Sequence, residues 1–332
     1  MDILTQGLLG GVLAQSVAQK SDKKIASFVG FFAGLLADAD FLISSSNDPL
    51  LNIEYHRHFT HSLLFVPVGA ALALIIMWPF FRKRVSIRHL YLFCLAGYSM
   101  SGVLDACTSY GTHLFWPFSD ARIAFNIISI VDPVFTFMLL AAFLIGIRNQ
   151  SNRVAYIGLI LCVTYLSLGF VQQKRAQTMA EQLVQQRGHS TAFHIVKPTL
   201  ANLLLWRSVY SHDDRIYVDA VRLGIFDANK IYEGDSVKKL IIHKDMQKLN
   251  ISSVLYLDIQ RFIKFSGGFV AFDPEQDFVL GDLRYSMLPT SIKPLWGIVI
   301  DIENPQIHAD YRFFRNNSQD VRQSFLNMLL GR

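Results

Sequence analysis

Apolar residues are gathered in the first half of the chain, in runs that short polar stretches interrupt. Six runs approach or exceed the length of about 20 residues with which a helix crosses a bilayer: 3–18, 25–43, 61–81, 90–107, 127–147 and 154–171. Small residues in the first run, such as Gly7, Gly10 and Gly11, favour close helix packing in lipid. The pattern therefore predicts an α-helical multi-pass membrane bundle of about six helices over residues 1–172.

The hydropathy pattern changes after residue 172. An amphipathic stretch at 173–189 predicts a connecting helix, and residues 190–332 predict a soluble α+β domain. Apolar, β-branched or alternating runs bounded by Gly, Pro and Asp indicate strands, at 202–210, 215–226, 267–273, 277–287 and 295–302. Helices are expected at 236–249, 252–264 and 318–331, on one face of a small antiparallel sheet.

The distribution of charge supports this division. Of the 57 Asp, Glu, Lys and Arg residues, 37 lie from Lys174 onward, and the whole chain is 52% hydrophobic. The net charge of +5 does not indicate a nucleic-acid partner. Basic residues of the first half fall in short loops between apolar runs, where membrane topology accounts for them.

The basic residues also predict an orientation. The loops expected on one side carry nine Lys or Arg, whereas the loops at 44–60 and 106–126 carry only Arg57 and Arg122. Cytoplasmic loops are enriched in Lys and Arg. We therefore expect these two loops, the N-terminus and the C-terminal domain to lie outside the cytoplasm.

A group of acidic residues and histidines within or at the edges of the apolar runs falls at the predicted outer level of the membrane. They are Asp38, Asp40, Glu54, His56, His58, His61, Asp105, His113, Asp120 and Asp132. Ionisable groups at membrane depth usually face a partner or a water-filled cavity. Asp132 precedes Pro133, so it is better explained as the N-cap of a helix.

The residue types in this cluster predict a metal site. Imidazole and carboxylate together suit a divalent ion, most often zinc. An ion with an open coordination position would activate water for hydrolysis, and Glu54, or an Asp that is not a ligand, would be the general base. No G-x-S-x-G or P-loop motif occurs in the chain.

Several stretches resemble the YdjM-like family of bacterial inner-membrane proteins, which are described as metal-dependent hydrolases. They are DILTQGLLGGVLAQ (2–15), GLLADADFLI (34–43), YHRHFTHSLLF (55–65) and LDACTSYGTHLFWPFSDARIAFNIISIVDPVFT (104–136), and segments at 197–210 and 265–287 resemble the long-form members. The resemblance implies a distant relation to zinc-dependent phospholipase C and P1-type nucleases. It implies a set of metal ligands, with Arg57 near an anionic substrate: Asp38, Asp40, His56, His61 and Asp105.

One position departs from the pattern of the family. Relatives often carry His four residues before Asp105, where this chain has Ser101.

The residues and the resemblance leave two hypotheses about function. The first is a membrane-bound metal-dependent hydrolase that acts on a phosphoester of a phospholipid or lipid-linked phosphate at the outer face of the cytoplasmic membrane, with Glu54 and Arg57 as catalytic residues. The second is a non-enzymatic envelope protein with a structural or degenerate metal site, which recruits partners through its C-terminal domain.

Overall fold

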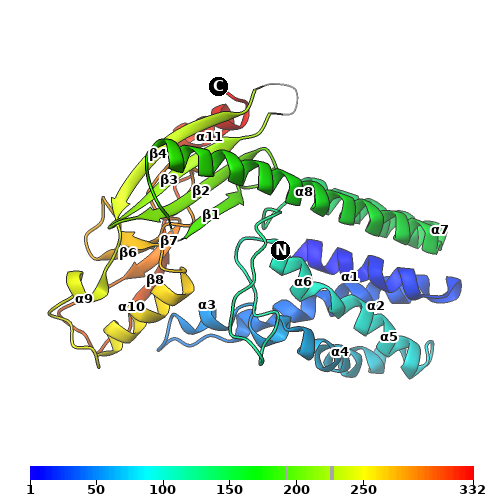
Figure 1. The fold of residues 1–332 in the computed structure, drawn as a ribbon. Coiled ribbons are helices and arrows are strands. Elements are labelled where there is room, and N and C mark those ends of the chain that lie inside the picture. Colours follow the sequence, from blue (N-terminus) through cyan, green and yellow to red (C-terminus); the bar gives the residue numbers. More distant parts are fainter. Residues whose placement is uncertain (192, 225–227) are drawn as a thin grey trace. The chain divides into compact units, whose positions relative to one another are not determined.

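The computed structural model of the chain describes residues 1–191, 193–224 and 228–332, which form two compact units (Figure 1). The first unit contains Met1–Leu42, Tyr55–Val171 and Leu200–Asn202. The second contains Ile43–Glu54, Gln172–Thr199 and Leu203–Arg332. The short segment Ile43–Glu54 therefore packs with residues far along the chain.

Helices joined by short 3₁₀ turns build the first unit (Figure 1). In chain order they are α1 (Ile3–Val17), η1 (Lys20–Asp22), α2 (Lys23–Leu36), η2 (Ala37–Leu42), η3 (Phe59–His61), η4 (Leu63–Phe65), α4 (Val66–Phe81), α5 (Ile87–Ser99), α6 (Ser101–Cys107), α7 (Pro133–Asn149) and the first part of α8 (Asn152–Gln186). The short helix α3 (Leu51–Tyr55) ends where the chain re-enters this unit.

Four stretches of the described residues are long and apolar enough to cross a membrane: Lys20–Leu42, Leu63–Phe81, Ile87–Cys107 and Asn152–Gln186. The other two predicted spans, α1 and α7, have only 15 and 17 residues. α7 begins at Pro133 because Asp132 accepts a hydrogen bond from the N–H of Phe135 at 3.0 Å and caps the helix. The capping role predicted for Asp132 is confirmed, whereas six membrane crossings stay a prediction.

The last apolar run and the predicted connecting helix form one continuous helix. α8 extends over 35 residues, from Asn152 to Gln186. The change of composition near residue 172 is therefore a change of side-chain polarity along one helix, without a break in secondary structure.

Glycines allow α1, α2 and α5 to cross closely. A Cβ atom on Gly10, Gly30 or Gly97 would overlap a backbone atom of a neighbouring helix. This confirms the close packing predicted for the small residues of the first run. Ser101, at the start of α6, donates a hydrogen bond to the carbonyl oxygen of Gly34 at 3.3 Å, which holds α6 against the end of α2.

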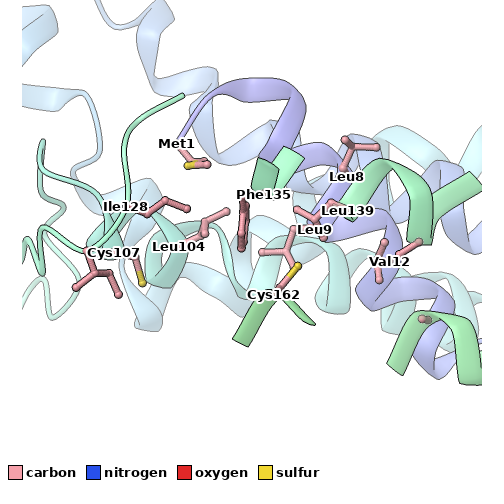
Figure 2. Packing of buried hydrophobic residues seen from close by; sticks show 13 residues of the cluster. Met1, Leu8, Leu9, Val12, Leu104, Cys107, Ile128, Phe135, Leu139 and Cys162 are labelled. Atoms are coloured by element: carbon pink, nitrogen blue, oxygen red, sulfur yellow. The ribbon is translucent and has the colours of Figure 1, made fainter. Parts of the chain in front are cut away.

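An apolar core joins α1 to α6, α7 and α8. Figure 2 shows its buried side chains, which include Leu8, Leu9, Val12, Leu104, Phe135, Leu139 and Cys162. Leu104 belongs to α6, so the core also holds the backbone of the next residue, Asp105, in place. A polar side chain at this point is fixed by the packing of its apolar neighbours.

The second unit contains two four-stranded antiparallel sheets, so the single small sheet predicted from the sequence was wrong. The first sheet contains β1 (His194–Pro198), β2 (Leu205–His212), β3 (Arg215–Arg222) and β4 (Lys230–Lys238), and the second contains β5 (Val270–Phe272), β6 (Val279–Asp282), β7 (Trp296–Val299) and β8 (Asp310–Phe313). A shared core unites them: Val209, Ile216, Val218, Phe269, Ala271 and Leu283. Every pairing joins consecutive strands, and the local alternation of residues does not show where one sheet ends and the next begins, so the sequence did not separate the two sheets.

Two of the three predicted helices in this unit are confirmed. They are α10 (Val254–Phe265) and α11 (Gln319–Leu329), whose N-cap Ser318 accepts from the N–H of Val321. The helix predicted at 236–249 was wrong over most of its length, because β4 continues to Lys238 and only α9 (Ile242–Asp245) is helical. Pairing of β4 with β3 overrides the local preference. The last two positions of the predicted strand 215–226 lie outside the described residues.

Candidate metal centre

The predicted metal ligands lie on short segments at the ends of apolar helices. Asp38 and Asp40 are on η2 after α2, His56 follows α3, His61 ends η3, and Asp105 is on α6 after α5. Asp38, Asp40 and Asp105 lie near the end of an apolar run, His61 lies at the start of one, and His56 follows the short helix α3. Tertiary packing then decides which of them meet.

Three of the five predicted ligands converge on one point. Nε2 of His61 lies 3.2 Å from Oδ1 of Asp38 and 3.0 Å from Oδ2 of Asp105. All three residues are buried, and these three atoms have no hydrogen-bond partner of acceptable geometry among the described residues. Buried polar atoms are normally hydrogen-bonded. Three buried lone-pair atoms within 4.8 Å of one another therefore fit a divalent cation.

Three carboxylates surround the ring of His61. Nε2 lies 3.2 Å from Asp38 and 3.0 Å from Asp105, and Nδ1 lies 3.2 Å from Oδ2 of Asp40. A metal-ligating histidine is deprotonated, so a bound ion would take the place of any proton on Nε2.

Asp40 lies beside this group and orients it. Its Oδ2 accepts hydrogen bonds from the N–H of Arg57 at 2.8 Å and the hydroxyl of Thr60 at 2.7 Å, and lies 3.2 Å from Nδ1 of His61. Nδ1 of His56 is 2.9 Å from Oδ1 of the same carboxylate. A carboxylate on the second nitrogen of a ligating histidine fixes the ring orientation. Asp40 has this geometry, and direct ligation by Asp40 or His56 stays a prediction.

Arg57 faces the metal centre from inside the protein. Its side chain is 4% exposed, and Nε lies 3.1 Å from Oδ2 of Asp105. Nη1 donates to Oγ1 of Thr108 at 3.1 Å and Nη2 to the carbonyl oxygen of Met1 at 3.3 Å, while the amino group of Met1 also contacts Asp105. These contacts give Arg57 a charge-balancing position, and its contact with an anionic substrate stays a prediction.

Glu54 is engaged elsewhere. It belongs to the second unit, where Oε1 accepts from Nε of Arg261 at 2.7 Å and Oε2 from Nη2 of Arg261 at 2.8 Å. Its carboxylate is therefore paired with an arginine of the second unit. Its role as a general base stays a prediction.

Sequence reasoning missed residues that support the centre without carrying charge. Gly102 packs so closely on His61 that a Cβ atom would overlap the carbonyl oxygen of that histidine. Thr60 and Thr108 hold Asp40 and Arg57 through their hydroxyl groups. Thr60 and Thr108 lie close to the ionisable residues within the stretches 55–65 and 104–136, and this spacing could have pointed to the two threonines.

Comparisons with known proteins match both halves of the chain. The family model described as YdjM inner membrane protein matches residues 1–176. The uncharacterized protein YfhP of Bacillus subtilis (strain 168) is 26% identical over 257 residues, which are 74% of this chain and 75% of that protein. The inner membrane protein YbcI of Escherichia coli (strain K12) is 33% identical over 97 residues, 29% of this chain and 55% of that protein. No solved structure matches the chain.

Proposed function

Because the chain belongs to the YdjM inner membrane protein family, we propose that it is a metal-dependent hydrolase of the bacterial inner membrane. The proposed substrate is a phosphoester, in a phospholipid or a lipid-linked phosphate. The proposed topology is multi-pass, with the metal centre at the outer face and the C-terminal domain outside the cytoplasm. The excess of Lys and Arg in the opposite loops supports this orientation.

The convergence of Asp38, His61 and Asp105 carries this proposal. Nε2 of one imidazole lies within 3.2 Å of an oxygen from each of two carboxylates, in a buried setting. Arg57 and the amino group of Met1 balance the charge of Asp105, but the three donor atoms have no hydrogen-bond partner of acceptable geometry among the described residues. Such a donor set, placed at the end of apolar helices, supports a metal centre that a lipid headgroup can reach.

Each residue of the centre has a proposed role. Asp38, His61 and Asp105 hold the ion, Asp40 and Thr60 orient the imidazole, and Arg57 balances the charge of Asp105. A divalent ion, zinc by its donor set, supplies polarisation of a phosphoryl oxygen and acidification of a water molecule. The side chain of Asp38 is 10% exposed, whereas those of His61 and Asp105 are 0% exposed. We therefore place the approach of substrate on the side of Asp38.

The alternative is a non-enzymatic envelope protein that recruits partners through its second unit. Ser101 supports this alternative, because the family resemblance leads us to expect a histidine at this position, and its hydroxyl donates to the carbonyl oxygen of Gly34 instead. A centre with one ligand fewer would bind its ion more weakly. Hydrolysis separates the two proposals, whereas metal binding alone does not.

The test combines metal analysis with lipid hydrolysis in the full-length protein. Wild type and His61→Ala are purified in detergent, and bound zinc is measured by mass spectrometry. Phosphate-containing products are then followed by ³¹P NMR in vesicles of bacterial phospholipid. His89→Ala, at an exposed imidazole on α5, is the matched control. We expect His61→Ala to lose the ion of the buried centre together with hydrolysis. Zinc binding without hydrolysis favours the non-enzymatic alternative, and a wild-type protein without bound metal contradicts the hydrolase proposal.

A further inference from the structure

A second convergence of imidazole and carboxylate groups lies in the first unit, outside the centre described above. Its members are His58, His113 and Asp120, and one ligand atom from each lies within 4.8 Å of the others. The two imidazole rings are 4.4 Å apart between centroids. The residues come from two separate loops, 56–58 and 112–122, so local sequence does not place them together.

Backbone hydrogen bonds hold these two loops in register. The N–H of His113 donates to the carbonyl oxygen of Arg57 at 3.1 Å, and the N–H of Leu63 donates to that of Leu114 at 3.0 Å. Thr112 and Ile123 exchange hydrogen bonds of 3.1 and 2.8 Å, which closes the loop that carries Asp120. The backbone positions of His58, His113 and Asp120 are therefore fixed relative to one another by hydrogen bonds.

The spacing of the donor atoms matches that around a shared ion. Oδ1 of Asp120 lies 3.8 Å from Nε2 of His58 and 3.5 Å from Nδ1 of His113. Ligand atoms at about 2.1 Å from one tetrahedral ion are about 3.4 Å apart. Observed separations near this value leave room for an ion between the atoms. They are also long for direct hydrogen bonds.

We propose that His58, His113 and Asp120 form a second centre for a divalent transition-metal ion, with zinc as the best match for two imidazoles and one carboxylate. The side chain of Asp120 is 60% exposed, so this centre is open to solvent, unlike the buried one. Water or a phosphate oxygen would fill the remaining coordination positions. The proposal does not depend on hydrolysis at the first centre.

The guanidinium of Arg122 should weaken binding of this second ion, and its removal therefore provides a specific test. Its Nε donates to Nε2 of His113 at 3.1 Å, which places the proton of a neutral ring on Nδ1. Ligation through Nδ1 requires the proton on Nε2, where it would face the N–H of Arg122. Removing the guanidinium should therefore tighten metal binding. In Arg122→Gln, the amide oxygen can accept the Nε2 proton and orient the ring.

Zinc titration of the full-length protein tests the proposal. The protein is stripped with a chelator, reloaded with zinc and analysed for bound metal, and Co²⁺ absorption reports the ligand environment. We expect two ions in wild type, one in His61→Ala and one in His113→Gln/Asp120→Asn, with two retained in the control His89→Gln. Arg122→Gln should bind the second ion about tenfold more tightly, the size typical of a changed outer-shell contact, whereas Arg88→Gln should not.

The variants separate the failure of one centre from that of the other. The second centre is disproved if His113→Gln/Asp120→Asn binds as much zinc as wild type with an unchanged Co²⁺ spectrum. If wild type binds a single ion that His113→Gln/Asp120→Asn loses and His61→Ala keeps, the second centre stands and the first fails. Asp120→Asn alone, at a largely exposed side chain, repeats the measurement without disturbing the fold.

Discussion

Nε of Arg57 lies 3.1 Å from Oδ2 of Asp105, and both side chains are buried. Arg57 adopts a left-handed backbone conformation with φ of 61°, which is uncommon for a residue other than glycine. The backbone therefore adopts a costly conformation at the residue whose guanidinium reaches the carboxylate. The pair links the loop before η3 to α6, two of the segments that build the metal centre.

Removing this guanidinium should destabilise the first unit. Arg57→Gln leaves Asp105 buried with less compensating charge, and breaking a buried pair in this way typically costs about 3–5 kcal/mol. Thermal unfolding in detergent, followed by tryptophan fluorescence, measures the loss. Arg88→Gln, at an exposed arginine, should unfold like wild type. An Arg57→Gln protein as stable as Arg88→Gln would show that the pair contributes nothing.

Adding one methyl group beside His61 should weaken metal binding. The Cβ of Gly102→Ala would overlap the carbonyl oxygen of His61 and push this ligand out of place. We expect zinc affinity at the buried centre to fall about tenfold or more, as when outer support of a ligand is lost. Gly11→Ala, which meets the ring of Phe143 away from the centre, controls for a general loss of packing. Equal zinc affinities in the two variants would contradict this.

Lys197 should make the stability of the second unit depend on pH. Burial, with the nearby charges of Arg284 and Arg207, holds the pKa of Lys197 well below its ordinary value of 10.5. Between the two pKa values the unfolded chain binds more protons than the folded one, so the free energy of unfolding rises with pH in that window. Wild type should therefore become more stable as the pH rises towards 10.

Lys197→Met tests this dependence. Nζ of Lys197 lies 2.9 Å from the ring centroid of Tyr285 and has no hydrogen-bond partner among the described residues. A neutral side chain of similar length should raise stability at pH 7 by about 1–3 kcal/mol and flatten the pH profile. Lys248→Met, at an exposed lysine, should leave the profile unchanged. Parallel profiles for wild type and Lys197→Met would refute the expectation.

Arg261 should control the exposure of residues 43–54 to proteases. Its guanidinium donates to both oxygens of Glu54 and of Asp48 and also to Asp258, all in the second unit. Lysine cannot reproduce this fork of hydrogen bonds. Limited proteolysis of Arg261→Lys should therefore cut residues 43–50 faster than in wild type. Arg312→Lys changes a largely exposed pair with Asp310 and should not speed this cleavage. Equal cleavage rates in Arg261→Lys and wild type would show that Arg261 does not hold residues 43–54 in place.

Cysteine labelling should reveal the orientation in the membrane. The native cysteines, Cys94, Cys107 and Cys162, are buried, so background labelling should be low. A membrane-impermeant maleimide should label Lys244→Cys in intact spheroplasts, because the C-terminal domain is expected outside the cytoplasm. Lys83→Cys, in a loop expected inside, should react only after permeabilisation. The reverse pattern would place the metal centre at the cytoplasmic face.

Features that depend on neighbouring residues could be predicted from the sequence alone. The apolar helices, the change to an α+β second half, the cap at Asp132 and the glycine contacts of the first helix follow from local hydropathy and side-chain size. The candidate ligands were also recognisable, because ionisable groups are rare at the ends of apolar runs. The break between α5 and α6 and the two separate sheets were not anticipated.

Only the tertiary structure decided which of these groups meet. Asp38, His61 and Asp105 converge, whereas Glu54 pairs with Arg261 and Arg57 lies against Asp105. Residues within one helix are placed by its 3.6-residue repeat, but the distance between two helices depends on how closely their backbones approach. Here glycine contacts between α1, α2 and α5 and backbone hydrogen bonds between loops set those distances, and neither is encoded by the spacing of residues along the chain.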